Sequence, residues 1–231
     1  MSLHPDLPLL REWSLPVSGG HVLHVREWGR GDGQPVLALH GGPGSGAGPL
    51  LWRVFDPQRW RVIVPDQRGA GRSTPASSVH ANTTADLLDD ISALRQHLGL
   101  ARWVIAGGSW GATLAMLAAA REPASVDALC LRAPFLARRE DIDAFFNGCP
   151  MPLLALHAAL HSGQASLREQ AAWQWWRWEQ QQAGPARSAE AKADTDTAAL
   201  VQRYRIQSHY LVNDCFLTTP LLHQLPALPN T

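Results

Sequence analysis

Cysteine, lysine and long apolar runs are all scarce in this chain. Cysteine occurs 3 times in 231 residues, at widely spaced positions and without a C-x-x-C pair. This predicts free thiols in a reducing compartment and argues against a disulfide framework. Lys192 is the single lysine, yet Lys+Arg and Asp+Glu number 20 each, so the net charge is zero. A neutral chain offers no electrostatic basis for binding nucleic acid or an anionic membrane surface.

Apolar segments are short throughout. No run reaches the roughly 18 apolar residues that a membrane-spanning helix needs. The segment Met1–Arg11 contains two prolines and an aspartate, and it has no apolar core of signal-peptide length. We therefore expect a cytoplasmic protein without a membrane partner. The composition, 45% hydrophobic and 17% charged, is ordinary for a globular protein. The length suits one core domain with an insertion.

The segment Gly107-Gly108-Ser109-Trp110-Gly111 carries the strongest chemical signal. The apolar run 103–106 before it is typical of a buried strand, and the run 112–120 after it is typical of a helix. A serine on such a turn, with glycine two residues away on each side, matches the nucleophile-elbow pattern. The tight turn pushes the hydroxyl of Ser109 toward a substrate. The backbone N–H of Trp110 lies at a helix N-terminus, where negative charge is stabilised.

A glycine-rich loop, His40-Gly41-Gly42-Pro43-Gly44, follows the short apolar strand 35–39. Its spacing matches neither a dinucleotide loop nor a P-loop, so phosphate binding is not favoured. The second half of an oxyanion hole fits better. His40 precedes the serine, which is the wrong order for a base in this arrangement, so we expect it to order the loop. In the next glycine-rich turn, Asp66 and Arg68 are expected to hydrogen-bond the loop backbone.

Strands and helices alternate through the first 137 residues. Strands are predicted at 13–17, 21–28, 35–39, 60–64, 103–106 and 126–131, and helices at 84–98 and 112–120. The alternation in 21–28 predicts a half-exposed antiparallel strand. Thr83 or Thr84 should cap the first helix, and Gly99 should end it. The pattern predicts an α/β fold with a mostly parallel sheet wrapped by helices, and an active site at the carboxyl ends of the strands.

From about residue 138 the alternation stops, and residues 138–222 are interpreted as a helical cap. Four of the ten tryptophans lie in this segment, at positions 173, 175, 176 and 178. They can form an aromatic core of the cap, a hydrophobic pocket over the serine, or both. Residues 186–198 are small and charged, and they predict an exposed loop or a frayed helix start.

Three motifs together resemble the prolyl iminopeptidase family of α/β-hydrolases. They are the loop 40–44, the segment Asp66-Gln67-Arg68-Gly69-x-Gly71-x-Ser73, and the elbow with Thr113-Leu114-Ala115 behind it. Weaker matches continue through Asn82-Thr83-Thr84, Leu131-Arg132-x-x-Phe135, Trp175-x-x-Trp178-Glu179 and 205–210, so the resemblance covers nearly the whole chain. It implies an α/β-hydrolase core with a cap, and release of an N-terminal proline from peptides.

The resemblance also implies roles for individual residues. Ser109 corresponds to the nucleophile, and Gly42 and Trp110 correspond to the backbone oxyanion donors. Two cap glutamates hold the substrate ammonium in the family. The first matches Glu179, whereas the second falls on Gln207, which accepts a hydrogen bond without charge assistance.

Further family positions lie near the proline pocket, and they match Arg132, Phe135 and Phe145. Leu211 stands where the family has an aromatic residue. The departures at Gln207 and Leu211 weaken the prediction of N-terminal proline specificity, whereas they leave Ser109 unaffected. On residue type alone, a solvated helix carboxylate is the favoured interpretation of Glu179, whereas its Trp-Glu context in the resemblance favours substrate binding.

The acid and the base of a catalytic triad are not evident in the sequence. This fold orders its triad as Ser, then Asp or Glu, then His. The histidines after Ser109, at positions 157, 161, 209 and 223, do not follow a predicted strand. Our hypothesis is a C-terminally truncated hydrolase that is inactive as given. It has an incomplete core (1–137), a cap (138–222) and the start of a return to the core (223–231).

Two alternatives remain open at this stage. The first is a related ester or amide hydrolase that does not recognise an amine, and the second is a non-catalytic pseudoenzyme. An epoxide or haloalkane hydrolase would carry Asp at the elbow, so Ser109 argues against those classes. The sequence predicts no metal or cofactor site. It implies a small peptide or ester substrate as the partner, and it leaves the oligomeric state open.

Overall fold

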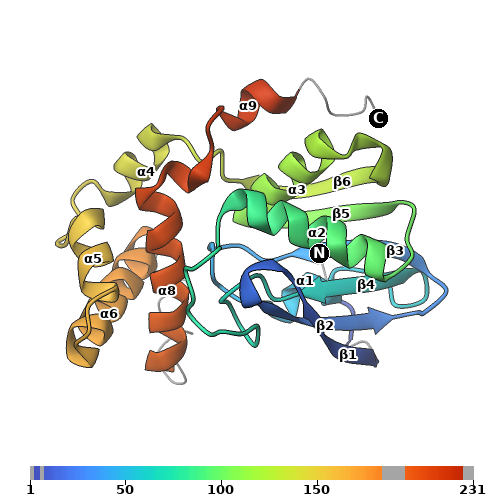
Figure 1. Ribbon diagram of the computed structural model, residues 1–231, viewed down its shortest axis with the longest axis horizontal. Helices are drawn as coiled ribbons and strands as arrows, with labels where there is room; N and C mark the ends of the chain where they lie inside the picture. Colours follow the sequence, from blue (N-terminus) through green and yellow to red (C-terminus); the bar gives the residue numbers. More distant parts are fainter. Residues whose placement is uncertain (1–2, 6–7, 184–195, 226–231) are drawn as a thin grey trace.

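The computed structural model describes residues 3–5, 8–183 and 196–225 of the chain. A six-stranded sheet occupies one side of the molecule, and most of the later helices occupy the other (Figure 1). The strands are β1 (Leu9–Pro16), β2 (Val22–Gly29), β3 (Gln34–Leu39), β4 (Trp60–Pro65), β5 (Trp103–Ser109) and β6 (Val126–Pro134). All the predicted strands are therefore present.

The strand order in the sheet is β1-β2-β4-β3-β5-β6. β1 pairs with β2, and β2 with β4, in antiparallel fashion. The remaining neighbours, β4-β3-β5-β6, are parallel. Because parallel strands end at one edge of a sheet, the loops after β3, β4 and β5 emerge together.

Helices cover the sheet on both faces, as the alternation predicted. α2 (Thr84–His97) and α3 (Trp110–Arg121) pack on one face, whereas α1 (Leu50–Arg53) contributes Trp52 to the other. Successive residues of the central strands therefore enter different cores. Leu37 and Ile105 join the larger core cluster, whereas Val36 belongs to the smaller one. A near-continuous apolar run is what a strand buried on both faces requires.

The start of α2 follows its sequence signal. Thr83 caps the helix by accepting a hydrogen bond from the backbone N–H of Asp86, whose side chain accepts one in return from the backbone of Thr83. This reciprocal pair satisfies two otherwise unpaired donors. Beyond the other end of the helix, Gly99 has a φ of 65°. The left-handed region favours glycine there.

The segment after β6 is helical. Its helices are α4 (Arg139–Phe146), α5 (Leu153–Leu160), α6 (Ala165–Ala183), α8 (Thr197–Val212) and α9 (Leu221–Gln224), together with the short 3-10 helix η3 (Asp214–Phe216). Two further 3-10 helices, η1 (Ser18–Gly20) and η2 (Pro123–Ser125), lie earlier in the chain. α4, α5, α6 and α8 lie beyond one end of the sheet (Figure 1). The ring of Trp175, which is fully buried, stacks on Tyr204 at 4.9 Å between ring centroids. An aromatic contact therefore joins α6 to α8.

The boundaries at residues 137/138 and 222/223 stay a prediction, although the change from strands to helices falls near the first. The proposed loop at 186–198 lies mostly outside the described residues, since the description resumes at residue 196 and α8 begins at Thr197. Residues 226–231 of the predicted return to the core also lie outside them. No helix in the described part of the chain is long and apolar enough to span a membrane.

The prediction that the strand at 21–28 is half-exposed was wrong. β2 lies inside the sheet between β1 and β4, and most of its side chains are buried on both faces. Glu27 is only 3% exposed. Its carboxylate accepts hydrogen bonds from Arg61 at 2.6 Å and from Arg11 at 2.9 Å. Polar residues in this strand therefore mark buried ion pairs and not a solvated face.

Candidate active site

Ser109 stands at the junction of β5 and α3, as the elbow pattern predicted. Its φ of 53° and ψ of −122° are unusual for a residue with a side chain. Both flanking glycines are required by close backbone contacts. A Cβ on Gly107 would lie 2.3 Å from the carbonyl carbon of Gly111, and one on Gly111 would lie 2.3 Å from the carbonyl oxygen of Leu39. The turn therefore holds the Ser109 side chain outward, where it is exposed.

Trp110 begins α3 directly after the serine. Its N–H belongs to the first helical turn, in which no earlier carbonyl of the helix can accept it. The indole ring is 0% exposed and donates a hydrogen bond from Nε1 to Oε1 of Gln67 at 3.2 Å. Burial of the ring thus fixes the backbone N–H beside Ser109, at the positive end of the helix dipole.

The glycine-rich loop after β3 reaches the same place. A Cβ on Gly41 would lie 3.5 Å from Cβ of Ser109 and 4.0 Å from its Oγ. Gly42 follows with a φ of 114°. The N–H of Gly42 donates no hydrogen bond to any residue of the described ranges. A loop N–H and a helix N–H beside one serine are the components of an oxyanion hole.

His40 orders this loop. The backbone N–H of Gln67 donates to its Nε2 at 2.9 Å, and its Nδ1 donates to the carbonyl oxygen of Gly41 at 3.0 Å. Burial lowers the pKa of His40, which keeps the ring neutral. Because both ring nitrogens are engaged, His40 has no nitrogen left to serve Ser109. The prediction of a loop-ordering role is confirmed.

Asp66 and Arg68 are structural. Asp66 accepts hydrogen bonds from the backbone N–H groups of Ala47 at 2.7 Å and Arg72 at 3.1 Å. Arg68 donates to the backbone carbonyl oxygen of Ala81 at 2.7 Å, and it also forms two bonds to the buried carboxylate of Asp90, at 2.6 and 2.7 Å. The backbone roles predicted for Asp66 and Arg68 are therefore confirmed. The main partner of Arg68 is a side chain of α2 that the sequence did not indicate.

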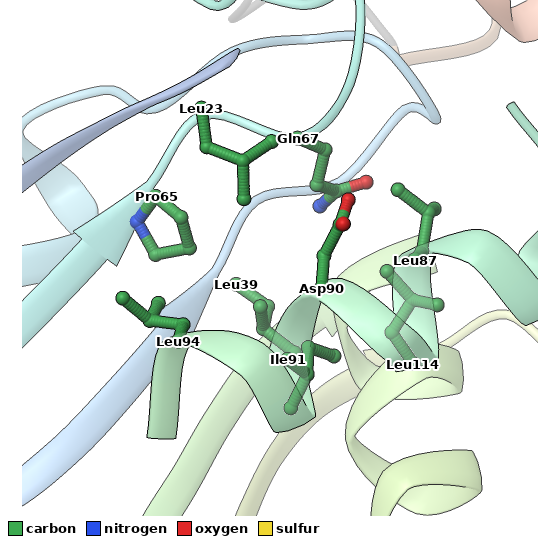
Figure 2. Close-up of a pocket in the computed structure, with 9 residues that line it drawn as sticks. All are labelled: Leu23, Leu39, Pro65, Gln67, Leu87, Asp90, Ile91, Leu94 and Leu114. Atoms are coloured by element: carbon green, nitrogen blue, oxygen red, sulfur yellow. The ribbon is translucent and has the colours of Figure 1, made fainter. Parts of the chain in front are cut away.

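Asp90 also borders a small cavity in the core (Figure 2). The carboxylate of Asp90 and the amide of Gln67 lie together at one side of it (Figure 2). The rest of the lining is apolar, from the side chains of Leu23, Leu39, Pro65, Leu87, Ile91, Leu94 and Leu114. Because the carboxylate of Asp90 is already paired with Arg68, we interpret the cavity as a packing gap between the sheet and α2.

Two of the predicted substrate-binding residues lie beside the elbow. The guanidinium of Arg132 packs over Gly108, since a Cβ there would lie 3.4 Å from its Nε. The backbone N–H of Phe135 donates to the carbonyl oxygen of Ser109 at 3.4 Å. The hydroxyl of Thr113 in α3 donates to the carbonyl oxygen of Phe135. The chain after β6 is thereby attached to the elbow.

The other predicted residues meet in the helical cap. Glu179 on α6 accepts hydrogen bonds from Nη2 of Arg203 at 2.7 Å and from the hydroxyl of Tyr204 at 3.0 Å. Nε2 of Gln207 lies 3.5 Å from the other carboxylate oxygen. We call Glu179, Arg203, Tyr204 and Gln207 the cap site. The structure brings Glu179 and Gln207 together, as the resemblance implied.

Sequence reasoning missed Arg203 and Tyr204. A signal was available for Arg203, because residues four apart share one face of a helix and Arg203 precedes Gln207 by four. Phe145 lies near the cap site, where its carbonyl oxygen accepts a bond from Nε1 of Trp178 at 2.8 Å. Leu211 is buried, with 5% exposure, within the core cluster.

α8 connects the cap to the catalytic loops. A Cβ on Gly44 would lie 2.7 Å from the carbonyl oxygen of Arg203, so this loop and the helix touch. The ring of Tyr210 packs edge-on against Trp110 with 5.2 Å between centroids. Nε2 of Gln202 donates to the carbonyl oxygen of Gly69 at 2.9 Å. One helix thus contacts the loops after β3 and β4 and the residue that follows Ser109.

Comparison with known proteins identifies the family. A family model described as the alpha/beta hydrolase fold matches residues 34–206. The proline iminopeptidase of Arabidopsis thaliana is 38% identical over 227 residues, which cover 88% of this chain and 60% of that enzyme. The probable proline iminopeptidase of Leptolyngbya boryana is 36% identical over 94% of this chain and 74% of the relative. The chain belongs to the proline iminopeptidase family of α/β-hydrolases.

The matches span 60% of the length of the Arabidopsis enzyme and 74% of the length of the Leptolyngbya boryana relative. A crystal structure of a probable hydrolytic enzyme from Pseudomonas aeruginosa PAO1 resembles this chain with a TM-score of 0.65 and 22% identity. That match covers 96% of this chain and 71% of the other. At this identity the likeness concerns the fold, and it agrees with the predicted fold class.

The histidines after Ser109 make other contacts in this member of the family. Nδ1 of His157 lies 3.2 Å from the hydroxyl of Ser208, and Nε2 of His161 donates to the carbonyl oxygen of Arg205 at 3.2 Å. Nε2 of His209 donates to the carbonyl oxygen of Asn82 at 3.0 Å. His223 is exposed on α9. Within the described ranges, no histidine or carboxylate hydrogen-bonds the hydroxyl of Ser109, and no group of three or more His, Cys, Asp or Glu side chains could hold a metal ion.

Proposed function

We propose that this chain carries the nucleophile and the oxyanion hole of a serine hydrolase that resembles prolyl aminopeptidases. In this proposal Ser109 attacks the carbonyl that follows an N-terminal proline or a similar small residue, and the N–H groups of Gly42 and Trp110 bind the developing oxyanion. The observation that carries the proposal is the closeness of the Gly41–Gly42 loop to Ser109. A Cβ built on Gly41 would lie 4.0 Å from Oγ of Ser109.

The positions of the predicted substrate-binding residues are consistent with this proposal. Arg132 and Phe135 border the elbow, and the backbone of Arg203, a residue of the cap site, approaches the loop at Gly44. A substrate held between these groups would have its leading residue toward the cap and its scissile carbonyl at Ser109. The curated relatives at 36–38% identity are named as proline iminopeptidases, which supports this class of substrate.

Deprotonation of Ser109 is the weak step in this chain. The side chains of His157, His161 and His209 all make contacts elsewhere. A serine without a neighbouring base retains only the small rate that the oxyanion hole and substrate binding supply. We therefore propose that the 231-residue chain is nearly inactive by itself.

The test is hydrolysis of a proline aryl-amide and of a short acyl ester by the 231-residue chain. We expect turnover about 10³-fold or more below that of a full-length relative, as for loss of triad members. The residual ester hydrolysis should fall further in Ser109→Ala. Turnover equal to that of a full-length relative would overturn the proposed inactivity. Equal residual rates in the parent chain and in Ser109→Ala would overturn the role of the serine.

A second candidate is an ester or amide hydrolase that does not recognise an amine. It is favoured by Gln207, which places a neutral amide beside Glu179 where a second carboxylate would attract a cation. Blocking the substrate amine by acetylation separates the two candidates. A large loss of binding after acetylation supports the aminopeptidase, whereas no loss supports the second candidate.

A further inference from the structure

Arg203 gives the cap site a balanced charge. The site contains one carboxylate, Glu179, and one guanidinium, Arg203, which are 2.7 Å apart. Their side chains are 17% and 31% exposed, so the pair is partly withdrawn from water. Tyr204 stays a neutral hydroxyl because burial raises its pKa, and Gln207 carries no charge. The carboxylate of Glu179 is already paired with the guanidinium of Arg203. An ammonium group that entered this site would therefore gain too little electrostatic attraction to offset the loss of its own hydration.

Two polar atoms of the site are buried without a partner among the residues that the structure describes. Within those residues, Oε1 of Gln207 accepts no hydrogen bond, and Nε of Arg203 donates none. Gln207 is 8% exposed as a residue. The amide of Gln207 must turn its Nε2 toward Glu179, because the reverse orientation would place two acceptors, Oε1 of Gln207 and the carboxylate of Glu179, against each other. A buried acceptor and a buried donor left unpaired each cost free energy, which a ligand with matching groups would recover.

The unpaired atoms define the matching ligand. Arg203 and Gln207 are four residues apart, so their side chains lie on one face of α8. A secondary amide presents an N–H for Oε1 of Gln207 and a carbonyl oxygen for Nε of Arg203. An ammonium presents donors only, and it leaves Nε of Arg203 unpaired.

We propose that Arg203 is a specificity-determining residue, which keeps the cap site neutral so that the site binds a secondary amide, as in an N-acylated amino acid, in preference to a free ammonium. This inference rests on the second candidate of the proposed function, the hydrolase that does not recognise an amine, because it assigns the cap site to the substrate end that lies away from Ser109. Of the charged pair, Arg203 has the more exposed side chain.

The test compares L-alaninamide with N-acetyl-L-alaninamide, which differ only in the acyl group on the amine. Chemical-shift titration of the 231-residue chain measures binding without requiring turnover. We expect N-acetyl-L-alaninamide to bind more tightly to the parent chain. Arg203→Met should strengthen binding of L-alaninamide about tenfold and weaken binding of the acetylated ligand, because Glu179 becomes free for a cation.

Two further variants serve as controls. Arg177→Met removes the same charge from an exposed position on α6 and should leave the ratio of the two affinities unchanged. Arg203→Lys keeps the charge but removes Nε, so it should leave binding of L-alaninamide weak and lower the affinity for the acetylated ligand. Far-UV circular dichroism and urea unfolding establish that each variant is folded.

Three results would overturn the inference: tighter binding of L-alaninamide by the parent chain, an unchanged ratio in Arg203→Met, or no binding of either ligand. The residual ester hydrolysis of the parent chain and of Ser109→Ala tests the role of the serine separately. A lower rate in Ser109→Ala together with an unchanged affinity ratio rejects only the role of Arg203. The expected change in the affinity ratio together with equal rates rejects only the role of Ser109.

Discussion

Arg68 illustrates how strongly a single buried charge depends on its partner. Its side chain is 0% exposed and that of Asp90 is 6% exposed. Removal of one member of a buried ion pair leaves the other without compensation. Burial already raises the pKa of Asp90 although the guanidinium opposes this effect, so the carboxylate is poorly solvated. The pair holds the turn after β4 on α2, next to the catalytic loops.

We predict that Arg68→Met lowers the free energy of unfolding by about 3–5 kcal/mol, as measured by urea denaturation. The matched control is Arg72→Met. Arg72 pairs with Glu12 at the surface, where the two side chains are 62% and 43% exposed. An exposed pair contributes less than about 1 kcal/mol. Equal effects of the two substitutions would contradict the structural role given to Arg68.

At the level of elements, the close approach of α3 to β3 positions the elbow. Gly111 in the first turn of α3 lies against the carbonyl oxygen of Leu39 at the end of β3. The same strand continues into the loop that carries Gly42. A displacement of α3 from β3 would therefore separate the two halves of the proposed oxyanion hole.

We predict that Gly111→Ala destabilises the chain by about 1–3 kcal/mol, because the new methyl group overlaps backbone that cannot move freely. Gly163→Ala provides the control, since a Cβ there meets nothing within 4 Å. The control should change stability by less than about 0.5 kcal/mol. Thermal unfolding of both variants measures the difference, and a neutral Gly111→Ala would show that the helix adjusts to the methyl group.

For the molecule as a whole, stability should depend on pH through the cap histidines. Burial, and then the nearby charge of His157, lowers the pKa of His161 to about 4. An unfolded histidine titrates near pKa 6.5. Between these values the unfolded chain takes up a proton that the folded chain does not, so stability falls as the pH decreases from about 6.5 to about 4.

We predict that His161→Gln reduces the slope of stability against pH in this window. The exposed His223 supplies the control, and His223→Gln should leave the slope unchanged. Urea denaturation at a series of pH values measures both. A slope that is identical in His161→Gln and in the parent chain would show that burial of this ring does not couple to folding.

The fold could be predicted because local sequence patterns are sufficient to specify its strands and the turns between them. Each of the apolar runs at 35–39, 60–64 and 103–106 is followed by a glycine-rich turn, and each forms a central strand. The elbow was also predictable, since its glycines and serine are contiguous. The burial of β2 was not, because Glu27 depends on Arg11 and Arg61 from two other strands.

The composition of the cap site was only partly predictable for the same reason. Glu179 and Gln207 were indicated by the resemblance alone. Their contact requires α6 and α8 to pack side by side, which no local pattern specifies. The pairing of Arg203 with Glu179 adds a charge that changes the chemistry of the site, and it becomes evident only when the distance between helices is known.

The contacts that α8 and η3 make with the segment after β4 also bear on the timing of synthesis. Hydrogen bonds join Gly69 to Gln202, Asn82 to His209 and Thr84 to Cys215, across separations of 133, 127 and 131 residues. A ribosome adds residues at about 5–20 per second. The segment between β4 and α2 therefore leaves the ribosome on the order of 10 s before its partners exist. During that interval the surroundings of Ser109 remain unfinished.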